Sequence, residues 1–392
     1  MKSVGNEPVA RRRRRPWLIA LPVGILAALG LAWTAFWFQA ASTTRTVLVG
    51  WQEREASLGR TYKCDEQSVG GFPFRFSLRC GAPQVTFSRT TPPTVFSARD
   101  AVVTAQVWQP DLIVGELAGP LEIADVADNA ALTVSWTLAQ ASLHGLPTSP
   151  EHAAFVLDRP SVVARRADTS AQTLLGEASR AAFDARIVSG SARRDPVLEL
   201  SLVLDDALAP ALGRAAAMPL DLDATGVLHG LKDLSPHSAR ETLRALQAAN
   251  GRLEVTRLRV QQGDVIATGA GTLRLSPRGA LDGELDVSVV NVDKLLPLLG
   301  VDRLVSRLLP QSTREKLAPQ LDKLMPGLGG LLRGNGGGGG SAADGAGSGS
   351  AGAALGPSTE VEGKKAVRLP LRILDGRVML GPFEIAELAP LY

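Results

Sequence analysis

The sequence predicts a mainly β fold: a long curved antiparallel sheet, either an open trough or sandwich-like, with a few short helices and one N-terminal transmembrane helix. Several segments alternate apolar and polar residues, which gives a strand one apolar and one solvated face. Gly (40) and Pro (25) are frequent and aromatic residues make up only 5% of the 392 residues, as suits short strands joined by turns. One uncharged run near the N-terminus is long enough to cross a bilayer.

Positive charge is concentrated in the predicted cytoplasmic arm, residues 1–16. This arm holds Lys2 and Arg11–Arg15, with Glu7 as its only acidic residue, so the rest of the chain, whose net charge is +3 overall, is close to neutral. A basic arm before an apolar span sets membrane topology, so we expect no nucleic acid among the partners.

The run 17–38 predicts a transmembrane anchor. It contains no charged residue, and about 20 apolar residues suffice to cross the hydrocarbon. Trp17, Trp33, Trp37 and Phe38 lie toward its two ends, where aromatic rings favour the headgroup level. Because the arginines precede the run, we expect a single-pass inner-membrane protein with its N-terminus in the cytoplasm and its C-terminal domain in the periplasm.

A cleaved secretory signal is the competing interpretation of this run. Signals have a shorter apolar region, about 7 to 15 residues, before a small-residue cleavage site. Ala40-Ala41 would provide such a site, but Phe38 would then occupy a position that prefers a small side chain. The sequence favours the uncleaved anchor.

A stalk helix is predicted over 43–58. Val47, Leu48 and Trp51 fall at helical spacing, and Gly59 can end the helix. We expect Trp51 to pack on the sheet, with a position at the bilayer interface as the alternative.

The two cysteines, Cys64 and Cys80, predict a disulfide. An even number of cysteines in an exported chain favours pairing. Cys80 lies in an alternating segment, and the turn signal Gly70–Pro73 can fold the preceding residues back against it. A loop of this length contributes roughly 3 kcal/mol. A reactive or metal-binding pair is the alternative, disfavoured by the lack of partner His or Cys at ligand spacing.

Motifs at the two ends of the ectodomain resemble those of a known family. They are Trp51, Cys64, the string Gly71, Phe72, Pro73, Phe74 and Arg75, Cys80, Leu369–Arg372, Asp375–Arg377 and Gly381-Pro382. In this order they resemble an uncharacterised envelope family of alphaproteobacteria, domain of unknown function 2125. The resemblance implies an envelope location and supplies no catalytic residue.

The β-rich periplasmic domain is predicted over 60–326. Segments around 132–138, 198–204 and 281–289 alternate apolar and polar residues, as strands do. Ser238 with Glu241 forms a capping box that predicts a short helix. Proline-broken Leu pairs over 295–332 predict short amphipathic helices, which either close one end of the sheet or, less favoured, lie on a membrane.

The C-terminal part of the sequence predicts a loop and a hairpin. Residues 327–363 are rich in Gly, Ser and Ala, which predicts a flexible loop. Residues 364–392 predict a hairpin around Asp375-Gly376 that returns to the same sheet.

No motif for catalysis, a cofactor or a metal is found. The four histidines, His144, His152, His229 and His237, are scattered, and the acidic pairs Asp205-Asp206 and Asp221/Asp223 fit solvated positions. We therefore expect no enzyme and no cofactor.

Two functions fit these features. The strand and turn pattern of 253–290 resembles that of AsmA-like envelope proteins, which implies an apolar groove that binds or guides phospholipid or another hydrophobic envelope component. The alternative is an envelope interaction scaffold with a closed β core and no ligand, whose partners are envelope proteins.

Overall fold

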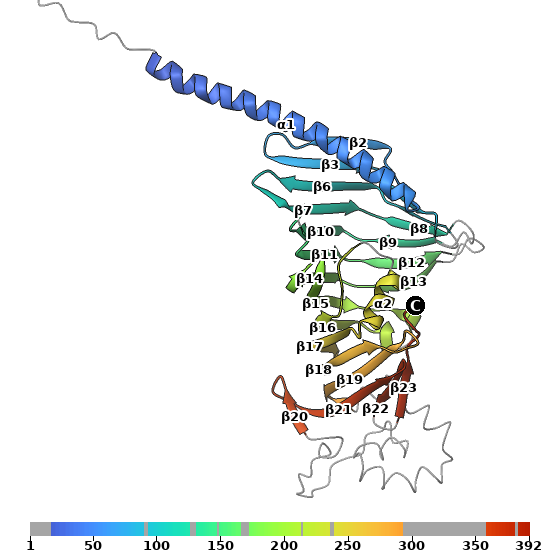
Figure 1. The fold of residues 1–392 in the computed structure, drawn as a ribbon. Helices are drawn as coiled ribbons and strands as arrows, with labels where there is room; N and C mark the ends of the chain where they lie inside the picture. Colours follow the sequence, from blue (N-terminus) through green and yellow to red (C-terminus); the bar gives the residue numbers. More distant parts are fainter. Residues whose placement is uncertain are drawn as a thin grey trace, which may run out of the picture.

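The computed structural model describes residues 17–89, 93–125, 131–146, 149–165, 172–212, 215–235, 239–292, 358–380 and 383–392. One long helix lies across the first strands of a tall stack of antiparallel strands (Figure 1). The predicted fold class, mainly β with one apolar N-terminal helix, is confirmed. The predicted arm 1–16, the Leu-rich helices, most of the loop 327–363 and the residues Ser238 and His237 lie outside the described residues.

Helix α1 spans Trp17–Ser57 and joins the predicted anchor and stalk in one element. Within the described ranges it is the one helix long and apolar enough to cross a membrane. The amide of Leu58 donates to the carbonyl of Glu55, and Gly59 has a φ of 83°, so the helix ends at the predicted glycine.

The strands form a small sheet and a large sheet, both antiparallel. The small sheet contains, in spatial order, β1 (Arg60–Lys63), β4 (Gln84–Phe87), β5 (Thr94–Ser97), β8 (Leu121–Asp125), β9 (Ala131–Ser135), β12 (Ser161–Arg165) and β13 (Gln172–Glu177). The large sheet contains β2 (Glu66–Gly70), β3 (Arg75–Gly81), β6 (Asp100–Gln106), β7 (Gln109–Ala118), β10 (Leu138–His144), β11 (His152–Asp158), β14 (Arg180–Ser191), β15 (Arg194–Ala207), β16 (Leu220–His229), β17 (Arg252–Gln262), β18 (Val265–Leu275), β19 (Leu281–Val290), β21 (Lys364–Leu374), β22 (Arg377–Leu380) and β23 (Phe383–Glu387), with β20 (Ser358–Val361) paired to β21.

Two-residue corners connect the two sheets. They are Ala82-Pro83, Ala98-Arg99, Gly119-Pro120, Trp136-Thr137, Arg159-Pro160 and Ala178-Ser179. Backbone hydrogen bonds continue through them: Ala82 donates to Arg99 at 3.0 Å and Thr137 donates to Asp158 at 2.9 Å. The small and large sheets are therefore two arms of one bent, hydrogen-bonded surface.

The corners reveal an internal repeat. Pro83, Pro120 and Pro160 each precede two strands of the small sheet followed by two strands of the large sheet. The strands β4–β7, β8–β11 and β12–β15 are thus three copies of one four-strand unit. At the middle corner a Cβ on Gly119 would lie 3.0 Å from the ring of Trp136, so only glycine fits without displacing that ring.

The corners also correct one predicted strand. The alternating segment 132–138 is two strands, β9 and β10, separated by Trp136-Thr137. Trp136 does not occupy a strand position, and its indole Nε1 donates to the carbonyl of Leu117 at 2.8 Å. The segments within 198–204 and 281–289 lie in β15 and β19, as predicted.

The last strands belong to the large sheet alone. The predicted hairpin turns at Asp375-Gly376, both with positive φ, and β21 pairs with β19, so it returns to the same sheet. One boundary is corrected: β20 occupies residues assigned to the loop 327–363, because Glu362-Gly363 forms a tight turn that pairs it with β21. The predicted short helix is α2, Ala239–Ala248. The described residues also form two short 3-10 helices, η1 (Pro210–Leu212) and η2 (Ala215–Ala217).

Buried apolar side chains gather at the C-terminal end of the large sheet. One cluster contains Val265, Val289, Val367 and Leu369, and a second, on the other face, contains Ile266, Val290 and Ala366. Among the described residues of 60–230, the buried hydrophobic side chains other than proline are only Ala139 and Ala192. A sandwich buries the inner faces of both sheets, so the bent part of this fold is not a closed sandwich.

Candidate functional site

The register of the large sheet aligns apolar residues in continuous rows across its strands. One row is Val69, Leu78, Val103, Gly115, Ala141, Phe155, Phe183, Leu202, Ala224, Leu258, Gly269, Val287 and Leu369, from β2 to β21. A neighbouring row on the same face is Phe76, Ala105, Ile113, Leu143, Ala153, Ala185, Leu200, Gly226, Val255, Gly271, Leu285 and Leu371. No polar side chain interrupts either row.

The middle of this face is open to solvent. Phe155 and Phe183 pair directly, and each keeps 41% of its surface exposed, with Leu202 beside them at 36%. At the C-terminal end the same face is buried, because Leu285 and Leu369 are only 8% and 4% exposed. The rows are therefore an accessible apolar surface in their middle and end in a packed core.

The small sheet carries an apolar row of its own. The row is Tyr62, Val85, Phe96, Ile123, Leu132 and Ala164. The rings of Phe87 and Phe96 meet edge to face at 5.3 Å on this side. Burial raises the pKa of the Tyr62 hydroxyl, with a further contribution from Glu55.

Helix α1 contacts the apolar rows of both sheets. Trp37 stacks on Phe76 of the large sheet with ring centroids 5.5 Å apart, and Trp51 packs on Tyr62 of the small sheet at 4.6 Å. Because one helix touches both rows, both lie on the same side of the bend. We call this side the inner face and the opposite side the outer face.

The outer face carries charge. Arg372 pairs with Glu284 at 3.1 Å, Arg257 pairs with Asp223 at 2.8 Å, and Arg186 pairs with Glu199. These exposed pairs contribute little stability each, but they keep this face in water. Asp223, for which the sequence predicts a solvated position, thus lies on the outer face in an ion pair with Arg257.

Each described histidine lies at the first or last position of its strand and pairs with a carboxylate. His144 lies 2.9 Å from Asp111, and His152 hydrogen-bonds Asp184 from the strand position opposite His144. His229 lies 3.6 Å from Glu254, whose pKa is lowered mainly by the hydrogen bond from Arg252. A hollow of about 450 Å³ adjoins His144 and His152. Across the described ranges, no three His, Cys, Asp or Glu side chains are grouped as a metal would require.

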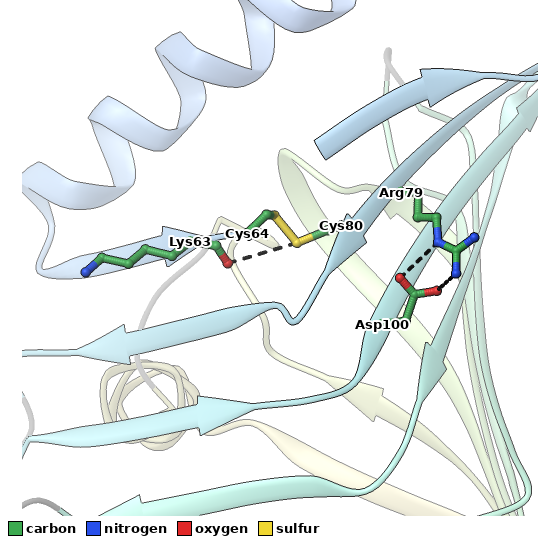
Figure 2. Close-up of a disulfide and its surroundings, with 5 residues drawn as sticks. All are labelled: Lys63, Cys64, Arg79, Cys80 and Asp100. Atoms are coloured by element: carbon green, nitrogen blue, oxygen red, sulfur yellow. Dashed lines mark hydrogen bonds and ion pairs between the residues drawn. A yellow bond between two sulfur atoms is a disulfide. The ribbon is translucent and has the colours of Figure 1, made fainter. Parts of the chain in front are cut away.

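The predicted disulfide between Cys64 and Cys80 is confirmed. Their Cα atoms lie 5.3 Å apart, across 16 residues of sequence. Figure 2 shows the bridge between the segment after β1 and strand β3, with α1 on the other side of β1. Cys64 follows the edge strand of the small sheet and Cys80 belongs to the large sheet, so the bridge fastens the two sheets together at the end where α1 packs.

The motif Gly71-Phe72-Pro73-Phe74-Arg75 forms the turn between β2 and β3. The amide of Arg75 donates to the carbonyl of Gly71 at 3.0 Å, and Gly71 has a φ of 98°, which explains the glycine. Phe72 packs against Trp37 and still exposes 48% of its surface, and Phe74 exposes 60%.

Trp37, one of the predicted anchor residues, packs on the first hairpin. Trp37 is only 4% exposed and is enclosed by Phe72 and Phe76, because α1 continues past the apolar run and lies on the first hairpin. Trp33, half-buried, donates through its indole to Pro73. Phe38 stays 61% exposed, and Trp17 begins α1.

The two aromatic residues at the centre of the inner face could not be predicted from the sequence alone. Phe155 and Phe183 were not singled out, although each lies in a segment bounded by turn residues. Their alignment depends on register between strands that are 28 residues apart in sequence, since Phe155 pairs with Phe183. Alternation over 181–187 would have placed Phe183 on the apolar face, but the apolar run 153–157 shows no alternation, so the face of Phe155 follows only from its pairing with Phe183.

Comparison with known proteins identifies the family. No curated protein and no solved structure matches the chain. One family matches, described as an uncharacterized protein conserved in bacteria (DUF2125), over residues 37–389. This range begins at Trp37, the residue that packs on the first hairpin, and includes every strand of the described residues. The chain therefore belongs to the DUF2125 family, as its motifs indicate.

Proposed function

We propose that this protein is anchored by α1 in the bacterial inner membrane and that its inner face, in the periplasm, binds the acyl chains of phospholipid or another envelope lipid. The observation that supports this most is the pair of uninterrupted apolar rows with Phe155 and Phe183 exposed at their centre. Exposed contiguous apolar surface marks sites for lipid, membrane or protein.

The energetics favour a lipid tail as the occupant. Each methylene removed from water contributes about 0.8 kcal/mol, so a tail with ten methylenes on the inner face gains roughly 8 kcal/mol. The rows offer no polar side chain that a tail would have to desolvate. The first strands of these rows lie under α1, and an apolar path from the bilayer would begin there.

We assign binding rather than catalysis to this protein. The paired histidines lie on the ion-paired face, and the residues of the inner face carry no titratable group along its two rows. The similarity of 253–290 to the strand pattern of AsmA-like proteins supports the same assignment.

A photocrosslinking experiment tests the lipid. Benzoylphenylalanine replaces Phe183 on the inner face or its neighbour Ala182 on the outer face, in the full chain expressed in bacterial membranes. We expect lipid adducts by mass spectrometry at position 183 and none at 182. Equal labelling at both positions, or adducts only with protein at 183, would contradict the proposal.

A second candidate function, an envelope interaction scaffold, is supported by one observation. Strand β23 is the last strand of the large sheet, and its described pairing is to β22 alone. An edge strand can add a strand from another protein. Benzoylphenylalanine at Glu384 in β23 would then give a protein adduct, whereas lipid binding alone predicts none at that position.

A further inference from the structure

The tip of the first hairpin of the large sheet, β2–β3, lies against the proposed membrane-spanning part of α1. The indole of Trp33 donates to the carbonyl of Pro73 at 3.1 Å, and the indole of Trp37 donates to the carbonyl of Arg75 at 3.3 Å. The next tip is joined to this turn, because the amide of Val107 donates to the carbonyl of Phe74 at 3.0 Å.

These tips expose aromatic rings rather than polar turn residues. Phe74 and Trp108 lie 6.1 Å apart and expose 60% and 69% of their surfaces, and Phe72 stacks on Phe38 at 6.2 Å. We call Phe38, Phe72, Phe74 and Trp108 the aromatic edge. The corresponding tip between β14 and β15, Ala192-Arg193, has no aromatic residue. The tip between β14 and β15 therefore lacks the exposed rings that the two tips near α1 carry.

The depth of α1 in a bilayer fixes the depth of these tips. An apolar run that starts at Trp17 crosses the hydrocarbon in about 20 residues, so it leaves near residue 36. Trp33 then lies within the outer leaflet, and its hydrogen bond holds Pro73 at the same level. A carbonyl at that level needs a donor from the protein, because lipid tails supply none. The two tryptophan indoles supply donors to the turn.

We propose that the aromatic edge inserts into the periplasmic leaflet of the membrane that α1 spans. This inference rests on the proposed membrane anchoring by α1, and it adds a second contact between the protein and the bilayer. Aromatic rings favour the headgroup level, where their apolar bodies meet lipid and their polar atoms meet water. The exposed Arg75 next to the edge places a cation near the lipid phosphates. The inner-face rows, which start at Val69 and Phe76, then begin at the lipid surface.

Spin labels on the full chain test this insertion. Single cysteines replace Trp108 in the aromatic edge, Val188 near the far tip of β14, or Leu29 in α1; all three positions are exposed. The native cysteines are bridged and do not react. The protein is reconstituted in vesicles of phosphatidylethanolamine and phosphatidylglycerol. The accessibility of each label to oxygen, relative to a water-soluble nickel chelate, measures its depth.

We expect the ratio at 108 to be several-fold higher than at 188 and closer to that at 29. A ratio at 108 equal to that at 188, with 29 deep, overturns insertion of the aromatic edge and leaves the anchor in place. A water-exposed label at 29 would contradict both the proposed membrane anchoring by α1 and the insertion of the aromatic edge. An absence of lipid adducts at position 183 would contradict lipid binding by the inner face only, and it would leave the anchor and the insertion of the aromatic edge unaffected.

Discussion

At the scale of single residues, the turn that begins at Gly71 depends on the absence of a side chain. A Cβ there would lie 2.6 Å from the carbonyl oxygen of Arg75, and the backbone is in the left-handed region. Gly263 has a positive φ as well, but no atom lies within 4 Å of its Cβ position. A substitution at Gly263 therefore tests backbone strain alone, whereas one at Gly71 tests backbone strain together with a steric clash.

We predict that Gly71→Ala destabilises the protein more than Gly263→Ala. The second change costs about 1 kcal/mol for the left-handed backbone alone, and the first adds the clash, for a total of about 3 kcal/mol. Urea unfolding of the detergent-solubilised chain measures both. Equal midpoints for the two variants would show that the turn relaxes around the new methyl group.

The disulfide gives a second prediction at this scale. Replacing Cys64 and Cys80 together by serine is expected to lower the free energy of unfolding by about 3 kcal/mol, because the closed loop restricts the unfolded chain. Wild-type protein in reductant should unfold at the same midpoint as the double variant. An unchanged midpoint in reductant would mean that the bridge adds nothing to stability.

A third residue-level prediction concerns pH. Arg259 donates to Glu362 at 2.7 Å, and this hydrogen bond, with the positive charges of Arg259 and Lys364, holds the pKa of Glu362 below its ordinary value of 4.5. A lowered pKa stabilises the fold above the ordinary value, and the contribution is lost as pH falls through the lowered one. The difference in unfolding midpoint between wild type and Glu362→Gln should therefore be constant from pH 7 to 6 and shrink as the pH falls below about 4.5. A difference that grows in acid would contradict this assignment.

At the scale of elements, α1 is held to the sheet by Trp37. Trp37→Ala should cost about 3 kcal/mol, since a buried aromatic ring is lost, and should release α1 from the first hairpin. Trp33→Phe, which removes one hydrogen bond and keeps a ring, should cost about 1 kcal/mol. Protease cleavage within residues 39–57, followed by mass spectrometry, measures the release. Equal protection of both variants would place the main attachment elsewhere on α1.

The strands show how far sequence reasoning reaches. Alternation predicted β15, β19 and the hairpin of β21 and β22, because each keeps one face apolar over its full length. Alternation did not separate β9 from β10. The corner Trp136-Thr137 between them shifts, by one residue, which positions of the chain face the apolar side. Ala139, rather than Leu138, therefore lies on the inner face with Leu157. A shift of one position reverses the faces, and a single-sequence pattern carries no mark of it.

At the scale of the whole molecule, the sequence predicts that the candidate site is an apolar sheet face, but it does not predict which residues form its centre. The sequence indicated one apolar face, whereas Phe155 and Phe183 become neighbours only through strand pairing. At about 4.8 Å per strand, the row from Val69 to Leu369 is roughly 55 to 60 Å long. A lipid tail reaches about 15 Å, half the hydrocarbon thickness. The proposed lipid tails would lie along the open middle of this row, between α1 and the packed C-terminal core.

The repeated unit yields a prediction for the whole chain. Deleting residues 120–159 joins Gly119 to Pro160 and removes one complete unit, β8–β11, while it keeps an X-Pro corner. We expect a folded, cooperatively unfolding protein that retains its disulfide. Deleting 138–158 removes only the large-sheet strands β10 and β11 and should destabilise the chain, since β8 and β9 lose their continuation. Circular dichroism melting curves compare the two. A folded shorter deletion with an unfolded longer one would contradict the repeat.

The corner prolines have a consequence for how such a protein changes over time. Duplication or loss of one proline-to-proline module alters the large sheet by two strands, roughly 10 Å, and leaves the helix at one end and the packed core at the other untouched. The distance between those ends is thus adjustable in fixed steps of two strands, without any change to the parts of the chain at either end.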